Sequence, residues 1–247
     1  MKTFADLVSA FDSFLWGVPL LLLLVGCHLF LTFRLKFIQR HIPLAIRLSL
    51  QKDPNAVGEI SHYGALSIAL AATIGTGNII GVATAIVLGG PGAVFWCWLC
   101  GIFGIATKYA ETLLSVKYRF VGEDGFIRGG PMYVMERAMH CKPLAVCFAV
   151  FTLMACTGIG SMVQSNAVSG YSAEVFHIPP MATGILEAIL IAAIVWGGLK
   201  FISRVCGALV PFMAVLYVLG CLAIIIINGQ TFLPALKLII TSAFSLK

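Results

Sequence analysis

Charged residues are scarce in this sequence. Asp, Glu, Lys and Arg make up 11% of the 247 residues, whereas hydrophobic residues make up 60% and the mean hydropathy is +1.01. Soluble domains contain about 25% charged residues, and a soluble core of this size could not hide so much apolar surface. The apolar runs approach 20 residues and lack the two-residue alternation of barrel strands. We therefore predict an all-α integral membrane protein built as a helical bundle.

The sequence also lacks the residue groupings that enzymes use. Zinc-type His and Cys spacing is absent, and the acids inside apolar runs are Glu187 and the near-interfacial Glu111, too few for an intramembrane protease. Seven of the eight cysteines lie in apolar segments, where cysteine acts as a small hydrophobe. The formal charge of +6 is distributed between apolar runs instead of forming one patch. We expect no enzyme, no organic cofactor and no nucleic-acid partner.

Six apolar segments are long enough to be predicted as membrane spans. They cover residues 14–33, 63–88, 92–116, 143–170, 181–199 and 205–227. The first is not followed by a signal-peptide cleavage site, so we interpret it as a retained anchor. The flanking parts are predicted as an outer-face interfacial segment (1–13), a cytoplasmic loop (34–62), and an outer loop followed by the start of a further, truncated helix (228–247).

Basic residues mark the orientation of these spans. Lys and Arg occur in the gaps after the first, third and fifth spans, and neither occurs in the gaps 89–92, 172–180 and 228–234. The positive-inside rule then places the N-terminus outside and the basic loops in the cytoplasm, as in a multi-pass protein of the cell inner membrane. The loop after the third span contains Gly-Gly-Pro followed by an apolar and charged mixture, which predicts a short amphipathic helix on the cytoplasmic face.

The second span contains polar residues at its centre, in "ALAATIGTGNIIG". The spacing G-x-G-x-x-x-G and the lipid-embedded context exclude a dinucleotide-binding loop. One interpretation is a packing seam, because Gly77 and Gly81 form a small-residue pair. The other is a helix that unwinds around 74–78. In that case the amides near Thr76 and Gly77 suit a carboxylate, and the carbonyls near Ile74 with the Asn78 side chain suit Na⁺.

Two further polar features lie in the fourth and fifth spans. Ser161, Gln164 and Ser165 share a helical face, so Gln164 could offer its amide to a ligand; the alternative is interhelical hydrogen bonding worth roughly 0.6 kcal/mol for each bond. Glu187 lies about two turns inside the fifth span with no cation near it in sequence. We consider it a possible coupling acid, and the alternatives are snorkelling to the outer interface or a protonated side chain.

Several ordered blocks resemble one transporter family. The run "GTGNIIGVATAIVLGGPGAVFWCWLCGIFGIATKYAETLLSVKYR" is similar to the signature of the alanine/glycine:cation symporters, also called sodium:alanine symporters, which centres on GGxGAxFWxW. "GGPMYVMERAM", "GIGSMVQSN" and "RVCGALVPFMAVLY" resemble further blocks of that family in the same order. The resemblance covers nearly the whole chain, and it departs from the family pattern at Thr157 and Ser161.

The resemblance implies a fold and an activity. The fold is a leucine-transporter-type five-plus-five inverted repeat, of which this chain would be the N-terminal half: one extra N-terminal helix and the first repeat, 63–227. The activity is sodium-coupled symport of alanine or glycine, with membrane lipid and a missing C-terminal half as further partners. A non-transporting truncated fragment and a proton-coupled amino-acid transporter are the alternatives.

The resemblance also implies roles for residues around the polar centre. Thr76 and Gly77 would hold the substrate carboxylate, and Gln164 would line the pocket. The Na⁺ ligands would be the side chains of Thr73 and Asn78 at one site and the carbonyls of Ala71 and Ile74 at another.

Overall fold

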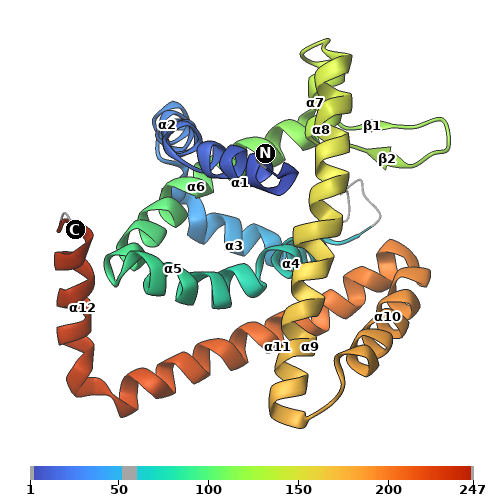
Figure 1. Cartoon of the computed structure of the whole chain (residues 1–247). Coiled ribbons are helices and arrows are strands. Elements are labelled where there is room, and N and C mark those ends of the chain that lie inside the picture. Colours follow the sequence, from blue (N-terminus) through green and yellow to red (C-terminus); the bar gives the residue numbers. More distant parts are fainter. Residues whose placement is uncertain (1–2, 52–59, 246–247) are drawn as a thin grey trace.

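The computed structural model describes residues 3–51 and 60–245, most of which are helical (Figure 1). The first elements are α1 (Phe4–Leu15), α2 (Val18–Arg34), the 3₁₀ helix η1 (Ile38–His41) and α3 (Ile42–Leu50). They are followed by α4 (His62–Thr73), the π-helix η2 (Gly77–Gly81), α5 (Val82–Gly89), α6 (Gly92–Lys117), β1 (Phe120–Val121), β2 (Ile127–Arg128) and α7 (Pro131–Arg137). The last are α8 (Lys142–Ala155), the π-helix η3 (Cys156–Met162), α9 (Val163–Phe176), α10 (Pro180–Trp196), α11 (Gly198–Ile227) and α12 (Gly229–Ala243).

The described helices have the length and apolar character of membrane spans. Four stretches, 4–34, 92–117, 142–176 and 198–227, are long and apolar enough to cross a bilayer, and α4 with η2 and α5 make a fifth if they form one bent span. α10 is a shorter apolar helix of 17 residues. The prediction of an all-α multi-pass membrane protein is confirmed at this level.

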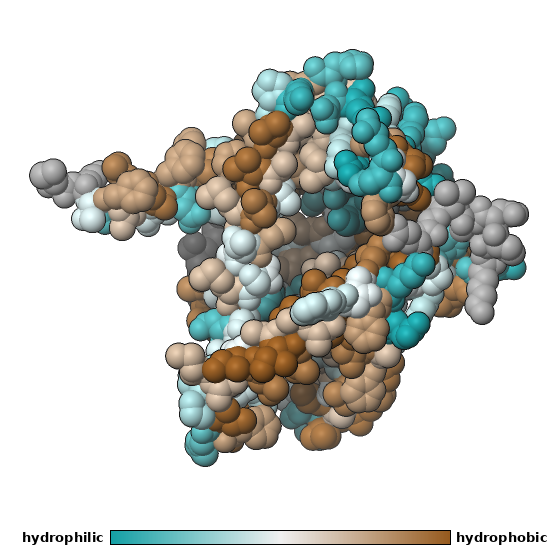
Figure 2. Space-filling model, turned by 90° about the vertical axis from the view of Figure 1, so that its right-hand side faces the viewer, coloured by the Kyte–Doolittle hydropathy of each residue, from teal (hydrophilic) through white to brown (hydrophobic). Residues whose placement is uncertain are grey.

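Large apolar side chains lie on the outside of the molecule. Val87 and Leu88 are each 82% exposed and Trp196 is 92% exposed, which is the arrangement expected where lipid is the solvent. Figure 2 shows hydrophobic residues over most of the lower part of one face and hydrophilic residues gathered in its upper part. Among the described residues, the buried ones are instead small and often hydroxylated: Gly64, Gly92, Ala106, Ala145, Val210, Thr32, Ser67, Thr183 and Ser203. Small residues at helix contacts let backbones approach closely in membranes.

The N-terminal helix is attached to the rest by polar contacts. α2 packs on α6, where His28 Nδ1 lies 2.7 Å from Thr107 Oγ1. Beyond the end of α2, Gln39 Nε2 donates to Thr32 Oγ1 (3.1 Å) and to the Ile102 carbonyl (3.2 Å). These contacts hold η1 and the C-terminal end of α2 against α6.

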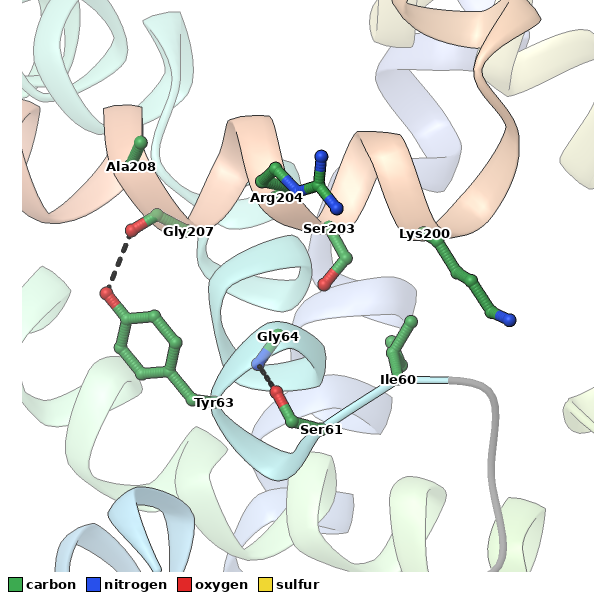
Figure 3. A pocket seen from close by; sticks show the side chains of 9 residues that line it. All are labelled: Ile60, Ser61, Tyr63, Gly64, Lys200, Ser203, Arg204, Gly207 and Ala208. Carbon is green, nitrogen blue, oxygen red and sulfur yellow. Dashed lines mark hydrogen bonds between the residues drawn. The ribbon is translucent and has the colours of Figure 1, made fainter. Parts of the chain in front are cut away.

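α4, the helix that ends at the polar centre, packs on α11. Ser61 accepts from the Gly64 amide (3.1 Å) at the start of α4, and the Tyr63 hydroxyl donates to the Gly207 carbonyl (2.9 Å) on α11 (Figure 3). A Cβ atom built on Gly64 would meet the Ser203 hydroxyl, so glycine is required for this approach. A cavity of about 480 Å³ lies beside the contact, with Lys200 and Arg204 on its rim.

Three connecting regions differ from the sequence predictions. The predicted loop 34–62 contains the helices η1 and α3, and the loop after α6 contains an antiparallel β1–β2 hairpin before the predicted amphipathic helix, α7. The outer loop predicted at 228–234 is helical instead, because α12 begins at Gly229 and includes Pro234. α12 packs on α6, where Trp96 Nε1 donates to the Ala243 carbonyl (3.2 Å).

Candidate functional site

The helical run in the second predicted span is interrupted at its polar centre. α4 ends at Thr73, Ile74 is extended (φ −81°, ψ 106°), and the helix resumes as η2 at Gly77. The two halves are bent by 50° with respect to each other. The structure therefore confirms an interrupted helix and not a continuous one, but the break is shorter than the predicted 74–78, because Gly77 and Asn78 already lie in η2.

The local sequence explains this interruption. Glycine inside a helix is destabilising by roughly 0.5–1 kcal/mol relative to alanine, and Gly75 and Gly77 lie two residues apart, on either side of the β-branched Thr76. Gly75 has a further role, because a Cβ at this position would lie 3.2 Å from both Oε1 and Nε2 of Gln164. Apart from its chain neighbours and the backbone of its own helix, no atom of the described residues lies within 4 Å of a Cβ built on Gly77, which leaves open space beside it.

Gln164 connects α9 to the interruption. Its Oε1 accepts a hydrogen bond from the Thr76 amide at 3.2 Å, across 88 positions of sequence. This amide belongs to the half-helix that begins at Gly77, whose first N–H groups have no partner inside the helix. The structure thus brings together Thr76, Gly77 and Gln164, the residues that the resemblance associated with the substrate.

The end of α4 supplies the opposite kind of group. The Ile74 amide donates to the Leu70 carbonyl (2.8 Å) and is the last to continue the α4 ladder, so the carbonyls from Ala71 to Ile74 have lost their helical amide partners. The Thr73 hydroxyl donates to the Ala69 carbonyl (2.7 Å) on its own helix. A carbonyl-rich helix end beside an amide-rich helix start can attract ions of opposite sign at neighbouring points.

Asn78 lies beside α11, whereas Gln164 reaches the interruption from α9. With Ile74 it lines a groove of about 680 Å³ whose other wall is α11, including Met213 and Tyr217. Asn78 is exposed, and its backbone N–H donates to the Gly75 carbonyl at 3.1 Å. No hydrogen bond joins the side chains of Asn78 and Thr73 in the described chain, so the structure places these two residues on the two sides of the interruption without direct contact.

The fourth predicted span is irregular beside the same point. A π-helix, η3, lies between α8 and α9 and ends directly before Val163, so Gln164 is at the second position of α9. π-helical turns often occur at functional sites. The Ser161 hydroxyl donates to the Thr157 carbonyl (2.8 Å) and the Thr157 hydroxyl to the Met154 carbonyl (2.8 Å). Ser161 therefore does not join Gln164 at the interruption, although the predicted face contained both.

Ser165 and Glu187 form a second polar contact on the other side of α9. Ser165 Oγ donates to Glu187 Oε2 at 2.6 Å, which links α9 to α10. The other carboxyl oxygen, Oε1, is enclosed and has no hydrogen-bond partner among the described residues. The sequence analysis identified Glu187 as a possible coupling acid but not its contact with Ser165, because no sequence signal indicated which face of α10 turns toward α9.

Comparison with known proteins places this chain among transporters. The sodium:alanine symporter family model matches residues 1–247. A sodium/alanine symporter of Methanococcus maripaludis, AgcS, is 49% identical over 249 residues, which covers 98% of this chain and 55% of the relative. An uncharacterized transporter of Haemophilus influenzae is 50% identical over 244 residues, with 98% of this chain and 54% of the relative covered.

The chain spans about half the length of these curated relatives. Its match is with a family of transporters, which confirms the prediction that it is not an enzyme. The interrupted helix, with opposite polar groups at its two ends, lies in a sequence that the family model covers completely. The chain belongs to the sodium:alanine symporter family.

Proposed function

We propose that this chain forms part of a sodium-coupled symporter for a small neutral amino acid, alanine or glycine, in the cell inner membrane. The observation that carries the proposal is the interrupted helix. Its amide end contacts Gln164, and its carbonyl end, at the end of α4, lies on the other side of the same break. The symporter named among the relatives supports the substrate class. Membrane transporters commonly bind substrate and coupling ion at such discontinuous helices.

The substrate carboxylate binds at the amides of Thr76 and Gly77. In the described structure the Thr76 amide donates to Gln164 Oε1, so an incoming carboxylate competes with this oxygen. Gln164 then turns its Nε2 donor toward the carboxylate, because an amide side chain presents both a donor and an acceptor. The open space beside Gly77 accommodates the substrate at this point.

Na⁺ binds at the carbonyl side of the interruption. The carbonyls of Ala71 and Ile74 provide one set of ligands, and the side chains of Thr73 and Asn78 contribute to a second site. The Thr73 hydroxyl keeps its oxygen available as a ligand while it donates to the Ala69 carbonyl. Further ligands and the opposite wall of the pocket come from the second half of a leucine-transporter-type five-plus-five repeat. A Na⁺ that moves inward through about 100 mV contributes about 2.3 kcal/mol to uptake.

Transport assays in proteoliposomes test this function, both with the chain joined to a second half of the proposed repeat and with the chain alone. We expect uptake of labelled alanine to require an inward Na⁺ gradient and to be lost when choline replaces Na⁺. Asn78→Leu removes the Na⁺-dependent uptake, whereas Asn166→Leu, which changes an exposed amide on α9 away from the interruption, retains it. Uptake driven by a proton gradient without Na⁺ favours the proton-coupled alternative. Absence of uptake under every gradient favours the non-transporting fragment.

A further inference from the structure

The cavity beside the α4–α11 contact is lined by two basic side chains and one buried hydroxyl (Figure 3). It has a volume of about 480 Å³ and lies between the start of α4 and the start of α11. Lys200, Ser203 and Arg204 lie on one face of α11, since they are three and four residues apart. The hydrogen bond from the Tyr63 hydroxyl to the Gly207 carbonyl (2.9 Å) lies at the end opposite Lys200. The positive charges of the cavity therefore come from α11.

The two basic groups have no counter-charge in the described structure. Lys200 and Arg204 are exposed, and the ion pairs among the described residues lie within α6 and within the β1–β2 hairpin. None of the described residues that line the cavity is acidic. Like charges four residues apart on a helix repel each other, and Lys200 also lies in the first turn of α11, at the positive end of the helix dipole. A bound anion would relieve both unfavourable interactions.

Ser203 gives an independent indication of a ligand. Its side chain lines the cavity, the residue is only 9% exposed, and no hydrogen bond joins its hydroxyl to another described residue. Buried hydroxyl groups normally have a partner, and Gly64, which lies opposite, has no side chain that could provide one. Ser61, at the start of α4, accepts from the Gly64 amide at 3.1 Å, and a hydroxyl that accepts can also donate. Two hydroxyl donors thus accompany the two cations.

These groups favour an anion, and a phosphate group fits them best. Lys and Arg form strong, charge-assisted hydrogen bonds with phosphate oxygens. The donors belong to two helices and approach from different sides, which suits tetrahedral oxygens better than a planar carboxylate. Basic pockets between membrane helices commonly bind phospholipid headgroups. Exposed leucines follow the lining residues on both helices, Leu66 on α4 and Leu209 on α11, so acyl chains have apolar surface beside the headgroup.

We propose that this cavity binds an anionic phosphate group, from the headgroup of an acidic phospholipid or from free phosphate. The ammonium and guanidinium groups of α11 neutralise its charge, and the hydroxyls of Ser61 and Ser203 donate to its oxygens. Because Ser61 precedes α4 and the other donors belong to α11, the bound phosphate links the two helices. It thereby fixes the start of α4, the helix that ends at the interruption at Thr73.

Native mass spectrometry of the purified chain in detergent tests the lipid as the source of the phosphate. We expect one phosphatidylglycerol molecule to stay bound, and phosphatidylcholine, which has no net charge, to bind several-fold more weakly. The double substitution Lys200→Gln and Arg204→Gln abolishes phosphatidylglycerol binding. The matched control, Arg40→Gln and Arg47→Gln, removes the same charge from exposed positions of another basic segment and retains the binding. Equal losses in the two double substitutions indicate general surface attraction and overturn the site.

Ser203→Ala is a milder second variant, which decides the result if the double substitution fails to fold. It removes the buried hydroxyl from the cavity and adds no atom. We expect binding of phosphatidylglycerol or phosphate to weaken several-fold, while the size-exclusion profile stays that of the unmodified chain. Unchanged binding of both ligands in Ser203→Ala overturns the assignment of this cavity.

Thermal unfolding in detergent tests free phosphate as the source. Inorganic phosphate is expected to raise the unfolding midpoint of the unmodified chain relative to chloride at the same ionic strength, and to leave that of the Lys200→Gln and Arg204→Gln chain unchanged. Binding of phosphatidylglycerol alone identifies the lipid as the source, and binding of phosphate alone identifies the free anion. Binding of neither, or equal retention of phosphatidylcholine and phosphatidylglycerol, overturns the proposal. These measurements need neither Na⁺ nor alanine, so they decide the phosphate site even if the proposed function fails.

Discussion

The contact between Gly75 and Gln164 is the narrowest point of the candidate substrate site. A Cβ at residue 75 would lie 3.2 Å from the Gln164 amide, closer than ordinary van der Waals contact, and the Gln164 side chain is the part able to move. Its displacement would break the 3.2 Å hydrogen bond to the Thr76 amide. The smallest possible side chain at residue 75 therefore changes the site without a large effect on packing elsewhere.

We expect Gly75→Ala to weaken alanine binding by about tenfold, equivalent to about 1.4 kcal/mol. Hydrogen exchange of the Thr76 amide should become faster, because its acceptor is displaced, and this measurement does not depend on transport. Gly81→Ala is the control: Gly81 ends the neighbouring π-helix η2, and the nearest neighbour of a Cβ there would be the Thr76 carbonyl oxygen at 4.0 Å. Unchanged exchange at Thr76 in Gly75→Ala would show that Gln164 adapts without leaving the amide.

Single residues also show the limits of sequence interpretation at the site. Gly75, Thr76 and Asn78 indicate an interruption because these residues are unfavourable in the middle of an apolar helix. Gln164 is visible for the same reason, as a polar side chain in a membrane span. The partners of His28 and Glu187 were not predictable, since they depend on the rotation of one helix against another and leave no periodic pattern in either segment.

At the scale of elements, the apolar helices follow from hydrophobic runs, whereas their irregular parts do not. The π-helix η3 lies in a segment with Thr157, Gly158, Gly160 and Ser161, which indicates a polar stretch in the span but not a π-helix. α3 and the β1–β2 hairpin were missed because they are short, and their stability depends on neighbours more than on propensity. The hairpin, for example, is joined to α7 by the Arg137 guanidinium stacked over Phe120 at 3.3 Å.

The packing of α4 on α11 can be tested by a compensating pair of substitutions. Gly64→Ala brings a Cβ against the buried Ser203 hydroxyl, and overpacking of this kind typically costs about 1–3 kcal/mol. Ser203→Ala removes that oxygen, so the new methyl would meet the residue 203 Cβ at 3.6 Å, an ordinary contact, and only the Ser61 hydroxyl oxygen at 3.3 Å would remain close. The double substitution should therefore be more stable than Gly64→Ala alone.

Thermal unfolding in detergent, followed by fluorescence-detected size exclusion, measures this difference. We expect a lowered midpoint for Gly64→Ala and a midpoint near that of the unmodified chain for the pair. Because α4 carries the interruption at its other end, the same cycle shows whether α11 holds the first half-helix in place. Additive losses in the double substitution would contradict the contact seen in Figure 3.

At the scale of the whole molecule, the distribution of Lys and Arg agrees with the arrangement of the connections. In Figure 1 the β-hairpin and the start of α11, both in basic segments, lie on the right, and the α5–α6 and α11–α12 connections, which contain no Lys or Arg, lie on the left. These four connections are separated as the positive-inside rule expects of basic and non-basic connections. We propose on this ground that the basic connections face the cytoplasm and the N-terminus lies outside.

Reporter fusions in a bacterial host test this orientation. Alkaline phosphatase is active only outside the cytoplasmic membrane, so a fusion after His177 should be active and a fusion after Arg137 inactive; a fluorescent protein that folds only in the cytoplasm should give the opposite pattern. Replacement of Lys200 and Arg204 by Ala lowers the bias of the last basic connection, while the basic residues around α3 and the hairpin remain. The orientation should therefore persist in that variant, because several loops share the signal. The reverse reporter pattern in the unmodified chain would contradict this orientation. It would place the half-helix that begins at Gly77, with its free amides, on the cytoplasmic side of the break and α4 on the outer side.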